Sequence, residues 1–270
     1  MIMTRRLFYS QTPERGIIMT EEKAIRINDD LNLIQNPNGL TFGTDAYLLS
    51  AFVKGGARST GADLGSGTGI IPLLCAARRK AARIFAVEIQ ESFAALIEKN
   101  AALNGLSEII QPFCGDVRLL KAADLGTEFD FVTANPPYMK VDSGKRNLHD
   151  EKFIARHEVC GDINDFCACA ARLLKHGGRF YCVWRPDRLV DLIASLRDHR
   201  LEPKVITFVA ATKESEPSMV LVRSVKGAAS GATVTKTLFL HDSPSDAAKN
   251  ILSNDAAKIY DTCSFEEFLK

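Results

Sequence analysis

Three glycines in a short loop are the first residues whose types and spacing point to chemistry. Gly65, Gly67 and Gly69 lie in ADLGSGTGI, directly after an apolar run and before a stretch with helical spacing. Glycine suits a tight turn that a ligand approaches more closely than a Cβ atom would allow. The free N–H groups at the start of the following helix would then face a polar or anionic group of that ligand.

A carboxylate at the end of the next apolar run narrows the class of ligand. Glu88 comes late in ARIFAVEI, residues 82–89, at about the separation at which dinucleotide-binding folds place an acid on ribose hydroxyls. A loose turn would explain the glycines and a solvated strand end would explain Glu88, but both explanations would have to hold together. The two features in register therefore predict a nucleoside-binding site.

The stretch FDFVTANPPYMK contains a second candidate site. An apolar run over 129–134 stops on Asn135, Pro136, Pro137 and Tyr138. In isolation, a proline turn without function is the plain explanation for such a tetrapeptide. Its place in the fold must decide between a turn and a site.

The order of the predicted elements supplies that place. Strands are predicted at 57–65, 82–89, 109–114, 129–134 and 179–184, and helices at 70–80, 90–104, 163–175 and 187–199. This alternation predicts an α/β, Rossmann-like fold, with a mostly parallel sheet and helices on both faces. Two further strands, 203–210 and 217–226, are joined by a short polar loop and must pair antiparallel. The predicted sheet thus has seven strands, and NPPY follows the fourth, at the edge where ligands bind.

Composition and organisation fit a globular protein with a full core. Hydrophobic residues make up 46% of the chain and charged residues 25%. No run of about 18 apolar residues and no signal-peptide core is present, which favours a cytoplasmic protein without a membrane span. We expect an N-terminal extension over 1–22, a catalytic domain over 23–226 and a small helical appendage over 227–270.

The seven cysteines are an odd number without C-x-x-C spacing, so neither a disulfide framework nor a zinc site is predicted. Reduced and mostly buried thiols are expected instead. We expect no bound metal. His149 and His157 lack a third ligand at a suitable spacing.

These motifs together resemble class I S-adenosyl-methionine-dependent methyltransferases, in the amino-methylating branch that carries [N/D/S]-P-P-[Y/F] after the fourth strand. NPPY matches fully, and Asp63 with the three glycines matches D-x-G-x-G-x-G. The resemblance implies the class I fold and S-adenosyl-L-methionine as cofactor. The expected cofactor-binding residues are Thr44, Asp63, Gly65, Gly67, Gly69, Glu88, Asp116, Val117 and Asn135. Asp116 is placed to accept a hydrogen bond from the adenine amino group, with a helix N-cap as the alternative role.

The implied chemistry explains the tetrapeptide. The lone pair of an exocyclic amine is delocalised, so the amine is a poor nucleophile. The side-chain oxygen of Asn135 and the backbone carbonyl of Pro136 would accept its hydrogens and stabilise the positive charge that develops on nitrogen. The prolines stiffen the backbone that holds this carbonyl, and Tyr138 offers a face on which a base can stack. We therefore expect Asn135, Pro136 and Tyr138 to be catalytic.

Adenine in DNA, adenine in RNA, guanine in RNA and a protein glutamine are all amine substrates that this machinery serves. The segments GLTFGTDAYLLSAF, 39–52, and ARHE, 155–158, resemble the bacterial tRNA adenine-N6 methyltransferases that act beside the anticodon of valine tRNA. The likeness extends over roughly 22–225 and implies a tRNA substrate. By this resemblance, Thr44 and Asp45 would lie over the cofactor pocket. The other three amines, and a non-catalytic RNA-binding scaffold, are the alternatives.

A basic stretch follows NPPY and is a candidate RNA contact. The residues expected to touch RNA are Pro137, Tyr138, Lys140, Lys145, Arg146, Arg156 and His157. The net charge of +1 provides no overall basic field, so an RNA-binding protein of this composition needs a local concentration of cations. A solvated loop is the alternative. We expect a monomer or a weak homodimer that binds tRNA.

Overall fold

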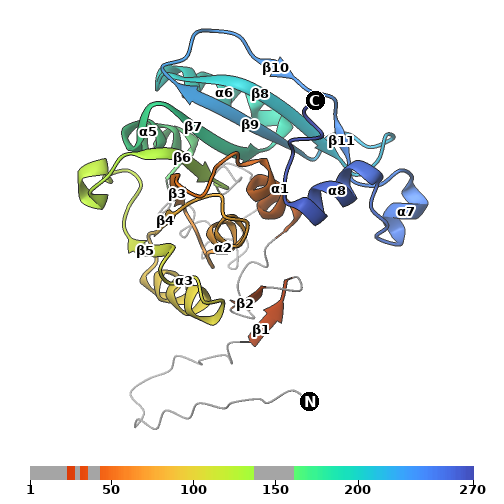
Figure 1. Cartoon of the computed structure of the whole chain (residues 1–270). Helices are drawn as coiled ribbons and strands as arrows, with labels where there is room; N and C mark the ends of the chain where they lie inside the picture. The colour runs from red at the N-terminus through yellow and green to blue at the C-terminus, as the bar shows by residue number, and fades with distance from the viewer. Residues whose placement is uncertain (1–22, 28–30, 36–42, 137–160) are drawn as a thin grey trace, which may run out of the picture.

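The computed structural model describes residues 23–27, 31–35, 43–136 and 161–270. The main sheet consists of β3 (Thr60–Leu64), β4 (Arg83–Glu88), β5 (Ile110–Cys114), β6 (Phe129–Ala134), β7 (Leu174–Trp184), β8 (Leu201–Ala210), β9 (Met219–Lys226), β10 (Thr233–Val234) and β11 (Leu238–Phe239). Their order is β10-β8-β9-β7-β6-β3-β4-β5, with β11 also paired to β8 (Figure 1). A separate antiparallel hairpin joins β1 (Lys23–Arg26) to β2 (Asn32–Gln35).

The strand directions confirm the predicted α/β class and refine it. Strands β5, β4, β3, β6 and β7 run parallel, and β9 is antiparallel to both β7 and β8. The predicted antiparallel pairing of the last two long strands is correct. However, β9 inserts between β7 and β8, so β8 again runs parallel to β7. The short strands β10 and β11, which the sequence did not predict, extend the β8 edge in parallel.

Helices cover both faces of this sheet, as predicted. The covering helices are α1 (Thr44–Phe52), α2 (Ile70–Ala77), α3 (Glu91–Leu103), α5 (Ile163–Leu173), α6 (Leu189–Asp198) and α8 (Asn254–Thr262), whereas the short α7 (Pro244–Ala248) has no buried residue. One apolar cluster packs α1, α2, α3 and α8 on one face, and a second packs α5 and α6 on the other. Burial of apolar surface on both faces is the main source of stability for such a sheet.

The boundary between α5 and β7 differs from the prediction. The helix expected over 163–175 ends at Leu173, and the strand expected over 179–184 begins at Leu174. Residues 176–178, which include Gly177 and Gly178, fall between these two predicted elements. In the structure Gly177 has a φ of 77°, and the pairing of β6 with β7 shifts register between Phe129 and Phe131. Glycine allows this irregularity inside the strand, so the strand is longer than its apolar core.

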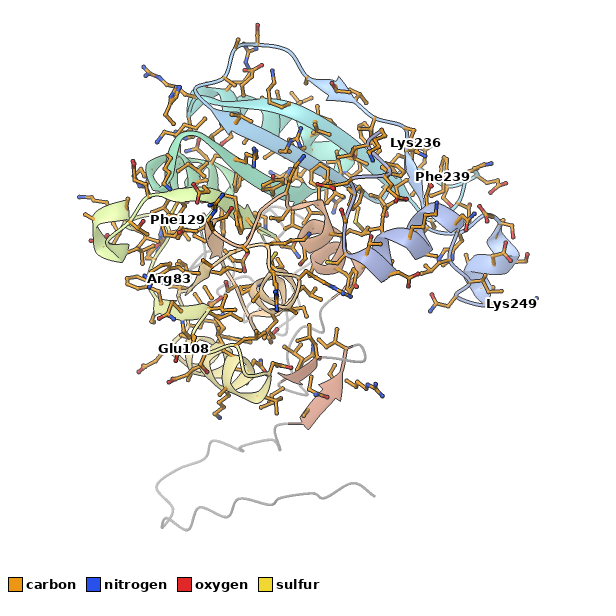
Figure 2. The ribbon with its side chains drawn as sticks, viewed as in Figure 1. Arg83, Glu108, Phe129, Lys236, Phe239 and Lys249 are labelled. Atoms are coloured by element: carbon orange, nitrogen blue, oxygen red, sulfur yellow. The ribbon has the colours of Figure 1, made fainter. Side chains whose placement is uncertain are left out.

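The segment after 227 packs against the first helix of the domain. The rings of Tyr47 in α1 and Tyr260 in α8 stack at 4.5 Å, and the Tyr47 hydroxyl donates to the Tyr260 carbonyl at 2.7 Å. The rings of Phe52 and Phe265 meet edge to face at 5.3 Å. Figure 1 shows α8 beside α1, and Figure 2 labels Lys236, whose ammonium lies 4.6 Å from the Phe268 ring. Helix α1 is therefore enclosed between the sheet and the C-terminal segment.

The register of three neighbouring strands fixes the place of the candidate site. Leu64 of β3 pairs with Val87 of β4 and with Ala134 of β6. The next residue on each strand is Gly65, Glu88 or Asn135. The first residues of β4 and β6, Arg83 and Phe129, are labelled on one side of the molecule in Figure 2. Because parallel strands end at a common edge, these three site residues lie at the opposite, carboxyl edge.

Candidate cofactor and methyl-transfer site

The glycine loop is built by backbone conformations that disfavour other residues. Gly65, Gly67 and Gly69 have φ angles of 69°, 54° and 82°. Side chains with a Cβ atom rarely adopt this left-handed region. The Gly65 and Ser66 N–H groups both donate to the Val87 carbonyl, at 2.9 and 3.0 Å, which ties the loop to β4. The loop then ends at Gly69, the N-cap of α2.

Glu88 closes this loop from the neighbouring strand and is almost fully buried. Its two oxygens accept the N–H groups of Gly67 at 2.9 Å and of Gln90 at 3.0 Å. A carboxylate offers about four acceptor positions, so two remain for ligand hydroxyls. A Cβ atom built on Gly67 would meet no atom within 4 Å, so the loop faces open space beside this acid. Glu88 therefore fits the ribose hydroxyls of a nucleoside cofactor, and the backbone of the glycine loop fits a close approach by that cofactor.

Asp63 lies beneath the loop. Its side chain is 1% exposed, and its oxygens accept the hydroxyl hydrogens of Ser66 and Thr133, both at 2.6 Å. The structure therefore shows Asp63 holding the loop to β6. The cofactor contact that the sequence predicts for Asp63 stays a prediction.

Burial raises the pKa of Asp63 to about 7, and the nearby Glu88 carboxylate adds to the rise that the two hydroxyl donors oppose. The folded protein thus keeps this proton to a higher pH than the unfolded chain, whose aspartates titrate near 4. This group makes the folded state less stable as the pH rises from about 4 to about 7. Two backbone carbonyls lie within reach of the same hydroxyls, those of Asp63 and Ala62, so a protonated acid can also be accommodated.

Asp63→Asn should gain stability relative to the unmutated protein as the pH rises, because the amide cannot ionise. Between about pH 5 and about pH 8 the difference in unfolding free energy should move by about 3 kcal/mol in favour of the variant. Urea unfolding at several pH values measures it. Asp130→Asn is the control, since hydrogen bonds from Thr60 and Lys175 outweigh partial burial and keep the pKa of Asp130 below its usual value. A pH-independent difference for Asp63→Asn would mean that Asp63 is ionised throughout.

Asp116 and Val117 follow β5, the strand next to Glu88. Nε of Arg118 lies 2.9 Å from both oxygens of Asp116, and the Arg118 N–H donates to one of them at 2.9 Å. This pairing lowers the pKa of Asp116 from its usual value. A bond from an adenine amino group would have to share the carboxylate with Arg118. The alternative role of helix N-cap is not what the structure shows, because 117–119 form a turn, with Val117 buried.

Asn135 stands half-buried directly after β6, and Pro136 behind it is buried. The amide nitrogen of Asn135 donates to Oδ2 of Asp45 at 2.9 Å. Oδ1 of Asp45 accepts the Ala46 N–H at 2.8 Å in the first turn of α1, which Thr44 begins. The side-chain oxygen of Asn135 is the end of the amide directed away from Asp45. The structure thus brings Thr44, Asp45 and Asn135 together.

Further residues of the site were not indicated by the sequence. Tyr260 reaches the start of α1 from the C-terminal segment. Burial raises its pKa, and a hydrogen bond with the Thr44 side chain opposes that rise. Thr133, one of the two polar residues of β6 together with Asp130, was a signal that could have revealed the bond to Asp63. No pattern within the sequence indicates the contact between Tyr260 and Tyr47.

Several predicted site residues cannot be placed. Outside the described residues lie Pro137, Tyr138, Lys140, Lys145, Arg146, Arg156 and His157, as does His149.

Five of the six described cysteines are buried, and Cys114 is exposed. Within 23–27, 31–35, 43–136 and 161–270, no three His, Cys, Asp or Glu side chains are grouped to hold a metal. In that same part of the chain, no helix is both long enough and apolar enough to cross a membrane.

The glycine loop, Glu88 and Asn135 all fall within one family match. Residues 38–194 match the model of the methyltransferase small domain. The chain belongs to the methyltransferase small domain family. It is a methyltransferase that uses S-adenosyl-L-methionine, as the sequence predicted.

Curated relatives extend this similarity over most of the chain. A tRNA1(Val) (adenine(37)-N6)-methyltransferase of Porphyromonas gingivalis is 31% identical over 209 residues, which are 74% of this chain and 80% of the relative. A protein of the same name from Pedobacter heparinus is 33% identical over 67% of this chain and 74% of its own length. The resemblance that the sequence suggested is confirmed.

Solved structures confirm the fold of this methyltransferase. The crystal structure of a predicted O-methyltransferase from Agrobacterium tumefaciens superposes with a TM-score of 0.65, at 22% identity, over 82% of this chain and 97% of that chain. A 16S rRNA N2 G1207 methyltransferase of T. Thermophilus gives a TM-score of 0.52 at 19% identity, over 76% of this chain and 50% of that chain. At these identities the likeness is one of fold alone.

Proposed function

We propose that this methyltransferase transfers a methyl group to the exocyclic N6 amine of an adenine in tRNA. The observation that carries the proposal is the position of Asn135, on the strand beside the glycine loop, with its amide nitrogen held by Asp45. An amide oxygen and a fixed Pro136 carbonyl suit an amine that must be polarised. The names of the curated relatives supply the nucleic acid, the base and its position in tRNA.

In this proposal the cofactor contributes an electrophilic methyl group on a sulfonium. Glu88 and the Gly67 loop bind and orient the nucleoside part, and the loop is kept in place by Asp63. Asn135 Oδ1 and the Pro136 carbonyl would accept the two amine hydrogens and favour a tetrahedral nitrogen. The lone pair of that nitrogen would form the new N–C bond while the bond between sulfur and the methyl group breaks and S-adenosyl-homocysteine leaves. The nitrogen becomes positively charged and then loses a proton to water, so no strong base is required.

The remaining predicted contacts belong to the RNA side of this proposal. Tyr138 would stack on the target base, worth about 1–3 kcal/mol. The RNA phosphates would be contacted by Lys140, Lys145, Arg146, Arg156 and His157. Pro137 would contact the target base. We further propose that residues 23–226 form the catalytic unit, with 1–22 as an extension and 227–270 as an appendage packed on it. A monomer or a weak dimer would suffice, because one chain carries all these residues.

The test is methyl transfer from radiolabelled cofactor to an unmodified valine tRNA transcript, followed by nucleoside analysis. We expect N6-methyladenosine, and no label when adenine 37 of the transcript is replaced by guanine. Label in guanosine, in DNA or in a protein glutamine would show that the substrate is a different one, while the proposed methylation of an amine would still hold. If none of these substrates accepted label while the cofactor bound, the protein would be a non-catalytic RNA-binding scaffold.

A further inference from the structure

The amide of Asn135 can serve the reaction in only one of its two orientations. Its oxygen must face the substrate amine, because the NH₂ group of Asn135 and the NH₂ group of the substrate are both donors and would repel each other. The side-chain torsion that exchanges the two ends has a broad, roughly two-fold profile, so the side chain alone does not select between them. Something outside Asn135 must choose the orientation.

Asp45 is placed to make that choice. A carboxylate can only accept hydrogen bonds, so the end of Asn135 that lies 2.9 Å from Oδ2 of Asp45 must be the nitrogen. With the nitrogen bound to Asp45, the Asn135 oxygen is the end of the amide that faces away from Asp45.

Asp45 is itself held in position by the fold. Its other oxygen accepts the Ala46 N–H, and it stands in the first turn of α1, where the helix dipole favours a negative charge. Helix α1 is fixed in turn by Tyr260, whose ring stacks on Tyr47 and whose backbone carbonyl accepts the Tyr47 hydroxyl hydrogen. The carboxylate therefore reaches Asn135 from a rigid support.

We propose that Asp45 is a positioning residue that sets the orientation of the Asn135 amide for methyl transfer, and that it does not act as a cofactor contact. This inference rests on the proposed function, since it assigns a partner to its key residue. It differs from what the resemblance implies for Asp45, which is a place over the cofactor pocket.

A double-mutant cycle tests the proposal on the full chain. Asp45→Ala should slow single turnover with tRNA about 10- to 100-fold, the scale of losing a hydrogen bond to a charged group, while cofactor affinity stays within a few-fold. In the Asn135→Ala background the same change should slow turnover no further, because its effect passes through Asn135. Additive losses, or a cofactor affinity that falls more than tenfold with turnover unchanged at saturation, would overturn the proposal.

Two further measurements distinguish a loss of Asn135 positioning from other causes of slow turnover. Asp191→Ala, which removes a first-turn carboxylate from α6, is the matched control and should leave turnover unchanged. The NMR signals of the Asn135 side-chain NH₂ group, identified by their loss in Asn135→Ala, do not depend on any substrate. In Asp45→Ala we expect them to shift and to exchange faster with water. Unmoved signals would refute the role of Asp45, whereas failure of the unmutated protein to methylate tRNA would refute the proposed function alone.

Discussion

Asn135→Ala is expected to slow methyl transfer about 10²- to 10³-fold, by analogy with removal of one preorganised group from an oxyanion hole. The amide oxygen gains strength as an acceptor only when the amine nitrogen becomes positive, so its loss affects the transition state more than the bound state. Turnover should therefore fall while the affinity for S-adenosyl-methionine stays nearly the same. Single-turnover rates with saturating cofactor, together with equilibrium cofactor binding, measure the two effects separately.

Asn164→Ala is the control for that experiment. Asn164 is an exposed amide in the first turn of α5 that bonds His199 and Ser195, and its loss should leave turnover unchanged. Full turnover in Asn135→Ala would make NPPY a proline turn and would remove the catalytic argument.

Gly67→Val should abolish measurable cofactor binding. The space next to a Cβ atom at Gly67 is open, so a branched side chain would point into the volume that the nucleoside is expected to fill. The left-handed backbone at this residue, with φ of 54°, adds strain of roughly 1–2 kcal/mol. Isothermal titration with S-adenosyl-methionine measures binding, and thermal unfolding measures the strain.

Gly105→Val separates these two contributions. Gly105 follows α3, has φ of 67° and also faces open space, so the backbone strain is matched away from the loop. Gly105→Val should lose a similar amount of stability and keep full cofactor affinity. Binding by Gly67→Val within a few-fold of the unmutated protein would mean that the loop does not contact the cofactor.

The parts of the fold that repeat a simple pattern could be predicted from the sequence. Most strands of the parallel sheet are short apolar runs followed by a helical period, and six of the seven long strands lie close to their expected ranges, the exception being the early start of β7 at Leu174. Helix α1 escaped prediction because Ala46 to Phe52 are all buried, between the sheet, α2 and α8. A helix covered on all sides has no polar face, so it shows no amphipathic period.

The candidate site likewise has some residues that local sequence patterns predict and others that they do not. The carboxyl ends of strands are local features, so Gly65, Glu88 and Asn135 could be identified from the runs that precede them. The order of strands is not local. The bonds from Thr133 to Asp63 and from Asn135 to Asp45 join residues 70 and 90 positions apart, and the first depends on β6 lying next to β3. Local patterns therefore identified the residues at the edge but not the side chains that hold them.

The stacking of Tyr47 on Tyr260 also has a consequence for synthesis of the protein. The two residues are 213 positions apart, so the contact forms only after almost the entire chain has left the ribosome. Until then α1 lacks the helix that encloses it, and Asp45 lacks its rigid support. The glycine loop, by contrast, is held by residues within 60–100 and by Thr133 through Asp63. During translation the glycine loop can thus form before Asp45 is supported. On the proposed function, a nascent chain would bind cofactor before it could modify RNA.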